Sequence, residues 1–126
     1  MPISPKGELY KLLKEKTIRR AREDSFVFTD YIFNYKSVDV HNSWHRFIDS
    51  NQSGLILACR DFGKTQHMVG RMLWELGKNP NLRNKIVTET EDLAGKILGL
   101  MANTVVKNER LKEVFPNLVP SGQSTK

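Results

Sequence analysis

Several features that mark other protein classes are absent or scarce in this sequence of 126 residues. There is one cysteine, Cys59, which excludes an internal disulfide and suits a reducing compartment. No run of about 18 apolar residues occurs, so a transmembrane helix is not expected. The opening residues, Met1-Pro-Ile-Ser-Pro-Lys6, lack the apolar centre of a secretory signal. We therefore expect a protein that is neither secreted nor inserted in a membrane.

Acidic residues are fewer than basic ones, 14 against 20, so the net charge is +6. Such a balance favours a polyanionic partner. The amino-terminal segment holds a dense group of basic residues, Lys11, Lys14, Lys16, Arg19, Arg20 and Arg22. This group fits either a solvated helix face or a surface that contacts DNA or a partner subunit. The hydrophobic content of 39% is ordinary for a folded domain.

The most informative motif begins with the apolar run from Gly54 to Cys59 and ends in Gly63-Lys64-Thr65. An apolar strand, a turn ending in Gly-Lys-Thr and a following helix are typical of a phosphate-binding loop. Glycine allows close backbone approach, the lysine reaches the β- and γ-phosphates, and the threonine hydroxyl binds Mg²⁺. The consensus has glycine where this chain has Ala58. The alternative interpretation is an ordinary strand-to-helix turn.

Periodicity and turn residues predict the order of elements along the chain. Helices are expected from Ser4-Pro5 to about Ile18, at 41–48, from near Gly63 to Gly77, and after a capping box Thr88-x-x-Glu91; strands are expected at 54–59 and 84–88. The expected core comprises Phe26, Phe28, Tyr31, Ile32, Phe33, Val69, Met72, Leu73, Leu76, Ala94, Ile97, Leu98, Met101 and Val105. Alternation of strands and helices predicts an α/β fold, with a parallel sheet covered by helices on both faces and preceded by a helical amino-terminal segment.

The loop also has a variant form, because Arg60 stands three residues before Gly63. The pattern Ala58-Cys59-Arg60-x-x-Gly63-Lys64-Thr65 resembles the deviant Walker A loop of phage terminase large subunits, the ATPases that package DNA into capsids. The flanking segments 41–47, 85–94 and 108–118 also resemble parts of that family. The resemblance covers roughly residues 25–120, and the loop is its most specific part.

The resemblance implies an incomplete P-loop NTPase fold of the RecA/ASCE type that binds ATP and Mg²⁺. Arg60 and Lys64 are implied as catalytic residues, with Arg60 acting as an arginine finger or nucleotide sensor; the alternative is that Arg60 pairs with an acid such as Asp61. Thr65 is implied as the Mg²⁺ ligand. The implied nucleotide-binding residues are Ala58, Cys59, Arg60, Asp61, Phe62, Gly63, Lys64, Thr65 and Gln66, together with His41 and Trp44 beside the adenine. The three histidines have no acidic or cysteine partner at a useful spacing, so zinc is not expected.

The expected domains are 1–52, a helical segment with the adenine-contacting stretch, and 53–126, the front part of an ATPase domain that stops before Walker B. We expect ATPase activity, with a separate nuclease domain, only of a full-length protein. The implied partners are double-stranded DNA, a small subunit, a portal protein and further copies of the motor, in the cytoplasm of a host bacterium carrying a phage or prophage. Two alternatives stay open: another P-loop ATPase, helicase-like or kinase-like, or a small basic DNA-binding or adaptor protein with an incidental Gly-Lys-Thr.

Overall fold

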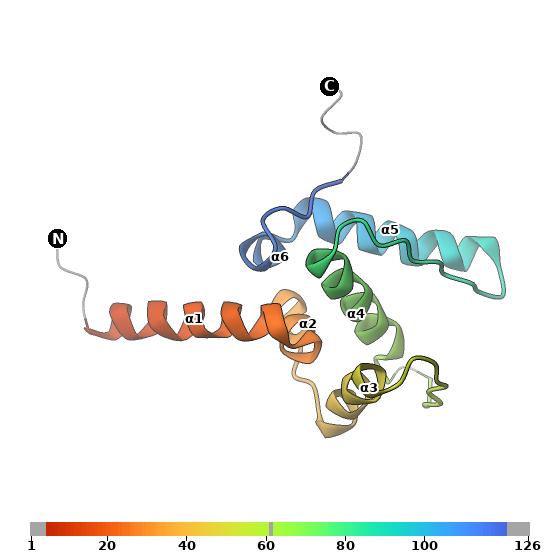
Figure 1. The fold of residues 1–126 in the computed structure, drawn as a ribbon, viewed down its shortest axis with the longest axis horizontal. Helices are drawn as coiled ribbons and strands as arrows, with labels where there is room; N and C mark the ends of the chain where they lie inside the picture. Colours follow the sequence, from red (N-terminus) through yellow and green to blue (C-terminus); the bar gives the residue numbers. More distant parts are fainter. Residues whose placement is uncertain (1–4, 61, 121–126) are drawn as a thin grey trace.

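Helices supply all the regular secondary structure in the computed structural model, which describes residues 5–60 and 62–120 (Figure 1). The six helices are α1 (Pro5–Glu23), α2 (Ser25–Phe33), α3 (Asp39–Ser50), α4 (Lys64–Lys78), α5 (Glu91–Lys107) and α6 (Glu109–Val114). Within the described ranges, none of them is both long enough and apolar enough to cross a bilayer.

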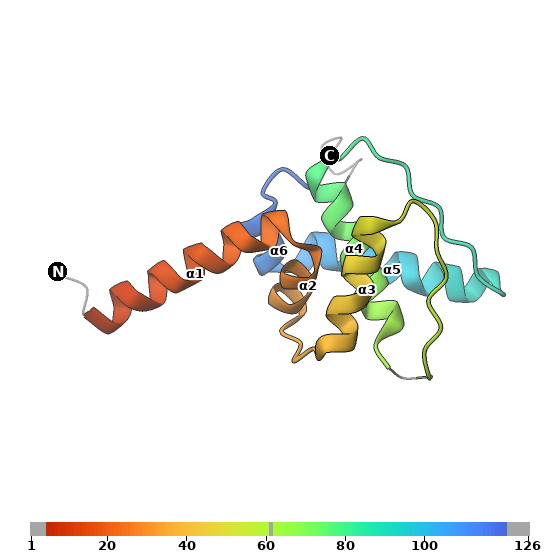
Figure 2. The ribbon, with the colours of Figure 1, turned by 60° about the horizontal axis from the view of Figure 1, so that its bottom comes forward.

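Helix α1 packs at one end only. Its amino-terminal half extends away from the other helices (Figures 1 and 2), and Leu9, Leu12 and Leu13 are exposed there. At its carboxyl end Ala21 is fully buried, and the Arg22 Nε donates to the Val114 carbonyl at 2.9 Å. The chain therefore anchors α1 through its last turns against α2 and α6.

Local capping explains where helix α2 begins and ends. The Asp24 carboxylate accepts from the Phe26 N–H at 2.9 Å, which satisfies one of the free donors of the first turn. Asn34 ends the helix in the left-handed region, at φ 56°, where asparagine is tolerated better than most residues. The aromatic segment between these caps is helical, and its Phe28 and Ile32 side chains are buried, as predicted.

The core gathers around α2, which contacts α1, α3, α4 and α6. Its buried apolar residues are Ala21, Phe28, Ile32, Val69, Leu73, Met101, Leu111, Val114 and Phe115. Helix α4 can approach α2 closely because Gly70 has no Cβ; a methyl group there would overlap the Thr29 side chain. The two helices that flank the predicted phosphate loop, α3 and α4, are thus held on a common support.

The predicted α/β fold with a parallel sheet is wrong for the described residues, which form no strand. Segments 54–59 and 82–88 have no regular secondary structure, and no backbone hydrogen bond joins them. Leu55, Leu57 and Val87 are 77%, 83% and 79% exposed, where a covered sheet would bury them. An apolar segment becomes a strand only when a neighbour completes its hydrogen-bond ladder, and these two segments lack one in the described chain. The RecA/ASCE-type sheet is therefore not part of this structure.

The helical predictions hold better than the strand predictions. The expected helices all occur, although the cap of α5 is Thr90, whose hydroxyl accepts from the Leu93 N–H at 3.2 Å, rather than Thr88. Met101 is buried as expected, but Leu98 on the same helix is 58% exposed. Residues 121–126, the end of the expected 53–126 segment, lie outside the described residues.

Candidate functional site

The predicted phosphate loop lies directly before α4 and closes back on itself. The Lys64 Nζ donates to the Ala58 carbonyl at 3.1 Å, so the side chain spans the loop from the first residue of the helix. Gly63 precedes it with φ 85°, a left-handed conformation that strongly favours glycine. Cys59 and Arg60 are exposed on the loop. The sequence motif thus corresponds to a compact turn at a helix start.

Among the described residues, no side chain caps the first turn of α4. Gly63 offers no capping group, whereas the first turns of α2, α5 and α6 receive side-chain oxygens from Asp24, Thr90 and Asn108. The first N–H groups of a helix carry the positive end of its dipole and need an acceptor or water. Lys64 is the first residue of α4, so its ammonium and these N–H groups belong to one turn and are donors of the kind that an oxyanion requires.

The remaining predicted loop residues are exposed or lie outside the described part of the chain. Thr65 and Gln66 are exposed in the first turn of α4, and Phe62 is 43% exposed. Asp61, the alternative partner of Arg60, lies outside the described residues. The roles assigned to Arg60 and Thr65 stay predictions.

His41 and Trp44, both on α3, do lie against the loop. The His41 Nε2 is 2.8 Å from the Phe62 carbonyl oxygen, and the Trp44 ring meets the rings of His41 and Phe62 edge-on, with centroids 5.0 and 6.1 Å apart. Trp44 is 6% exposed, so in this conformation its faces are not open for stacking on a base. An open hollow of about 370 Å³ lies on the Lys64 side of the loop, lined partly by Phe47 and Met68.

Sequence reasoning missed a chain of hydrogen bonds that runs through the core beneath the loop. Its members, in order, are Arg71, Ser25, His45, His67, Ser37 and Asp30. The His45 Nε2 lies 3.1 Å from the His67 Nδ1, and the Ser25 Oγ lies 2.7 Å from the His45 Nδ1. These groups come from α2, α3, α4 and the connector after α2. The position of His67 one turn beyond Gly63 was the available sequence signal; nothing in the sequence pointed to the two serines.

When both imidazoles are neutral, the Asp30 end of this chain of hydrogen bonds fixes its direction. An ionised Asp30 carboxylate can only accept, so the Ser37 hydroxyl donates to it and accepts from the His67 Nε2–H. The neutral His67 then accepts at Nδ1 from the His45 Nε2–H, and the neutral His45 accepts at Nδ1 from the Ser25 hydroxyl. The Arg71 guanidinium, which can only donate, supplies the hydrogen bond that the Ser25 oxygen accepts.

The electrostatics agree with neutral histidines. Burial lowers the pKa of His45 to about 4, and the neighbouring His67 and Arg71 act in the same direction. Burial also lowers the pKa of His67 to about 4, with a smaller contribution from His41. The side chains are 0% and 2% exposed, so water does not screen them. In the described part of the chain no group of histidine, cysteine or acidic residues is arranged to hold a metal ion.

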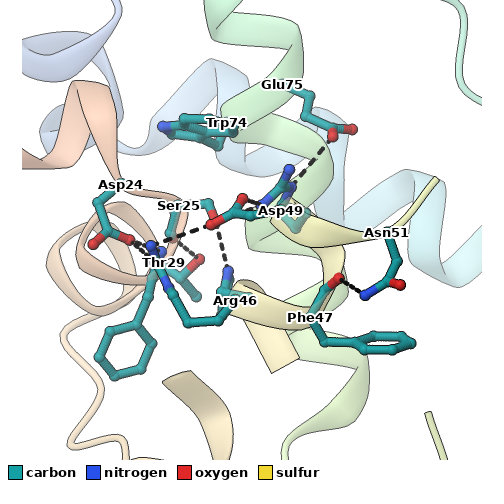
Figure 3. A network of polar contacts seen from close by, with 12 residues as sticks. Asp24, Ser25, Thr29, Arg46, Phe47, Asp49, Asn51, Trp74 and Glu75 are labelled. Atoms are coloured by element: carbon teal, nitrogen blue, oxygen red, sulfur yellow. Dashed lines mark hydrogen bonds and ion pairs between the residues drawn. The ribbon is translucent and has the colours of Figure 1, made fainter. Parts of the chain in front are cut away.

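Ion pairs hold Arg71, which is one end of this chain of hydrogen bonds (Figure 3). Arg71, itself buried, pairs with Asp49 of α3 and with Glu75 one turn further along α4, the latter at 3.2 Å. Arg46 extends the group by pairing with Asp49 at 3.1 Å and with Asp24. The network therefore links α3 and α4 to the start of α2, and it fixes the two helices that position the loop.

Comparison with known proteins adds no identification: no family model, curated protein or solved structure matches this chain.

Proposed function

We propose that residues 58–65 bind the phosphates of a nucleoside triphosphate together with Mg²⁺, and that the chain is the ATP-binding portion of a DNA-packaging ATPase similar to phage terminase large subunits. The observation that carries the phosphate-binding part is the hydrogen bond from the Lys64 ammonium to the Ala58 carbonyl, made from the first turn of a helix that no described side chain caps. The packaging part depends on the sequence resemblance alone. The phosphate-binding part concerns the loop and the first turn of α4, so it does not depend on the sheet that the described residues lack.

Three residues, Lys64, Thr65 and Arg60, have defined roles in this proposal. The Lys64 Nζ exchanges the Ala58 carbonyl for a phosphate oxygen, which makes a stronger, charge-assisted hydrogen bond. The free N–H groups of the first α4 turn bind the same phosphates. Bound Mg²⁺ would offset phosphate charge, with the exposed Thr65 hydroxyl as its one protein ligand and phosphate oxygens and water as the others. Arg60, also exposed, would approach the terminal phosphate.

The test compares Mg·ATP binding by the intact chain and by Lys64→Ala, measured by isothermal titration calorimetry. A charge-assisted hydrogen bond contributes about 1.5–3 kcal/mol, so the variant should bind roughly ten- to a hundredfold more weakly. Lys96→Ala removes the same charge from an exposed site on α5 and is the matched control, expected to stay within about twofold. Equal affinities of wild type and Lys64→Ala would refute the assignment of the loop.

One observation favours a second candidate, a basic DNA-binding or adaptor protein. Helix α1 extends from the body with exposed basic residues on it, among them Lys11, Lys16, Arg19 and Arg20. Such a surface binds DNA with an affinity that falls steeply with salt. Salt-sensitive binding of duplex DNA, unchanged by Mg·ATP and by Lys64→Ala, would favour this candidate over the ATPase.

A further inference from the structure

The Phe62 carbonyl, in the loop immediately before Gly63, accepts a hydrogen bond from His41 of α3. The His41 Nε2 lies 2.8 Å from this oxygen, and the His41 Nδ1 lies 3.1 Å from the backbone nitrogen of Val38. The Val38 N–H can only donate, so the Nδ1 must be the unprotonated nitrogen. The proton of the neutral ring is then on Nε2, where it points at a carbonyl that can only accept. The geometry thus specifies one tautomer and one direction for both bonds.

The His41 ring is itself held from two helices. It stacks on the His67 ring of α4, with centroids 4.4 Å apart and an interplanar angle of 11°, and it meets Trp44 edge-on. Gly63 lies against the same pair, since a Cβ on it would sit 3.5 Å from the His41 Nε2 and 3.6 Å from His67 Cδ2. The donor that reaches the loop therefore cannot swing away without disturbing α3 and α4.

Among the described residues, two side chains make hydrogen bonds to the backbone of the loop, and phosphate binding would remove one of these bonds. Lys64 holds the Ala58 carbonyl, and His41 holds the Phe62 carbonyl. When Lys64 turns to a phosphate, the first bond is lost and the second keeps the end of the loop in place. A loop that stays ordered loses less conformational entropy when its ligand binds.

We infer that His41 is a positioning residue, which tethers the end of the 58–63 loop through the Phe62 carbonyl and so holds the amides at the start of α4 ready for phosphate. The phosphate part of this inference rests on the proposed function; the tether does not. His41 acts through the loop and does not itself contact the nucleotide in this assignment. It differs in this from the adenine contact that the resemblance implies.

Three substitutions separate the two hydrogen bonds of His41. Glutamine places an amide donor near the position of Nε2, so His41→Gln keeps the bond to the Phe62 carbonyl. Asparagine places a polar atom near Nδ1, so His41→Asn keeps the bond from the Val38 N–H and loses the tether. His41→Phe keeps a ring against His67 and loses both bonds. Asn42→Ala, on the same turn of α3, is the control.

Two readouts are measured on the intact chain, the dissociation constant of Mg·ATP and the alkylation rate of Cys59 in the absence of ligand. Cys59 is the single thiol, it is exposed and it lies on the loop, so its rate reports loop mobility without further labelling. We expect His41→Phe and His41→Asn to weaken Mg·ATP binding about three- to tenfold, the equivalent of one ordinary hydrogen bond, and to speed alkylation. His41→Gln and Asn42→Ala should stay within about twofold of wild type on both readouts.

The outcomes discriminate between the tether and the proposed function. If wild type and Lys64→Ala both ignore Mg·ATP while Cys59 still reacts faster in His41→Phe and His41→Asn than in His41→Gln, the proposed function fails and the tether stands. If glutamine rescues neither readout, or all His41 variants match wild type, the tether is refuted. Melting temperatures identify any variant that fails to fold, and the glutamine–asparagine comparison remains decisive because both are neutral amides.

Discussion

Acidification should destabilise this protein well above the pH at which its carboxylates titrate. His45 and His67 have folded pKa values of about 4, whereas an unperturbed histidine titrates near 6.5. The unfolded state therefore binds protons first as the pH falls. The stability due to the neutral histidines is complete above about pH 6.5 and is lost progressively as the pH falls towards 4.

The size of the effect follows from the same pKa values. Each histidine loses on the order of 2 kcal/mol between pH 7 and 5, because one pKa unit corresponds to about 1.4 kcal/mol. The pair thus accounts for a few kcal/mol, a large part of the 5–15 kcal/mol typical of a folded domain. The hydrogen-bonded chain adds to the cost at His67, because a proton on its Nδ1 would face the His45 Nε2–H from which this nitrogen accepts. At His45 the Ser25 hydroxyl can turn and accept instead.

The carboxylates act in a lower range of pH. The Tyr31 hydroxyl, which donates to Glu113, lowers the pKa of that carboxyl, so its contribution is present above the ordinary value and disappears on acidification below it. Burial raises the pKa of Asp30, and protonation of Asp30 in acid partly offsets the loss. Neither group changes the sign of the slope between pH 7 and 5.

Urea denaturation at half-unit steps from pH 8 to 5 measures this slope. Because the chain has three histidines, all within this cluster, histidine ring NMR can follow the same protons directly. We expect His45 and His67 to remain neutral in the folded protein at pH 5, each with its proton on Nε2. A free energy of unfolding that is flat from pH 7 to 5, or folded-state titration of these rings near pH 6.5, would refute the reasoning.

Two further predictions concern packing, and each has an internal control. Gly70→Ala should destabilise the protein by about 1–3 kcal/mol in urea melts because its methyl group would overlap Thr29. The control is Gly95→Ala on α5, whose methyl group would meet nothing; it should be neutral or stabilising by up to about 1 kcal/mol. The opposite order would contradict the close approach of α2 and α4. Leu73→Ala should lower the free energy of unfolding by about 2–5 kcal/mol because the Leu73 side chain is fully buried. Leu98 is 58% exposed, so Leu98→Ala should lower it by less than about 1 kcal/mol. Similar losses at both sites would contradict the described core.

The helices could be predicted because their signals are local. Apolar residues three and four positions apart predicted the buried side of α4, where Val69 and Leu73 are 1% and 0% exposed. The cap of α5 was missed by two residues, since Thr88 and Thr90 offer the same hydroxyl and only the backbone geometry separates them.

The strands could not be predicted reliably because a strand is not a local structure. Residues 54–59 carry the apolar run of a buried strand, yet Leu55 and Leu57 are exposed. The same run becomes a strand or an irregular segment according to whether a neighbouring strand is present.

In the candidate site, too, residues close together in the sequence could be predicted and contacts between distant residues could not. Gly63 and Lys64 were found from a contiguous motif, and His41 from a short flanking segment. The chain from Arg71 to Asp30 joins residues more than forty positions apart through the packing of several helices. A single sequence carries no pattern for such a contact; its histidines drew notice only in the prediction that they form no zinc site.

Amide NMR of Gly63, Lys64 and Thr65 tests the central claim most directly. Addition of Mg·ATP, or of Mg²⁺ with pyrophosphate, should shift these three amide resonances saturably, while adenosine should leave them in place. Resonances that stay unmoved at millimolar Mg·ATP, in a sample shown to be folded, would contradict the account.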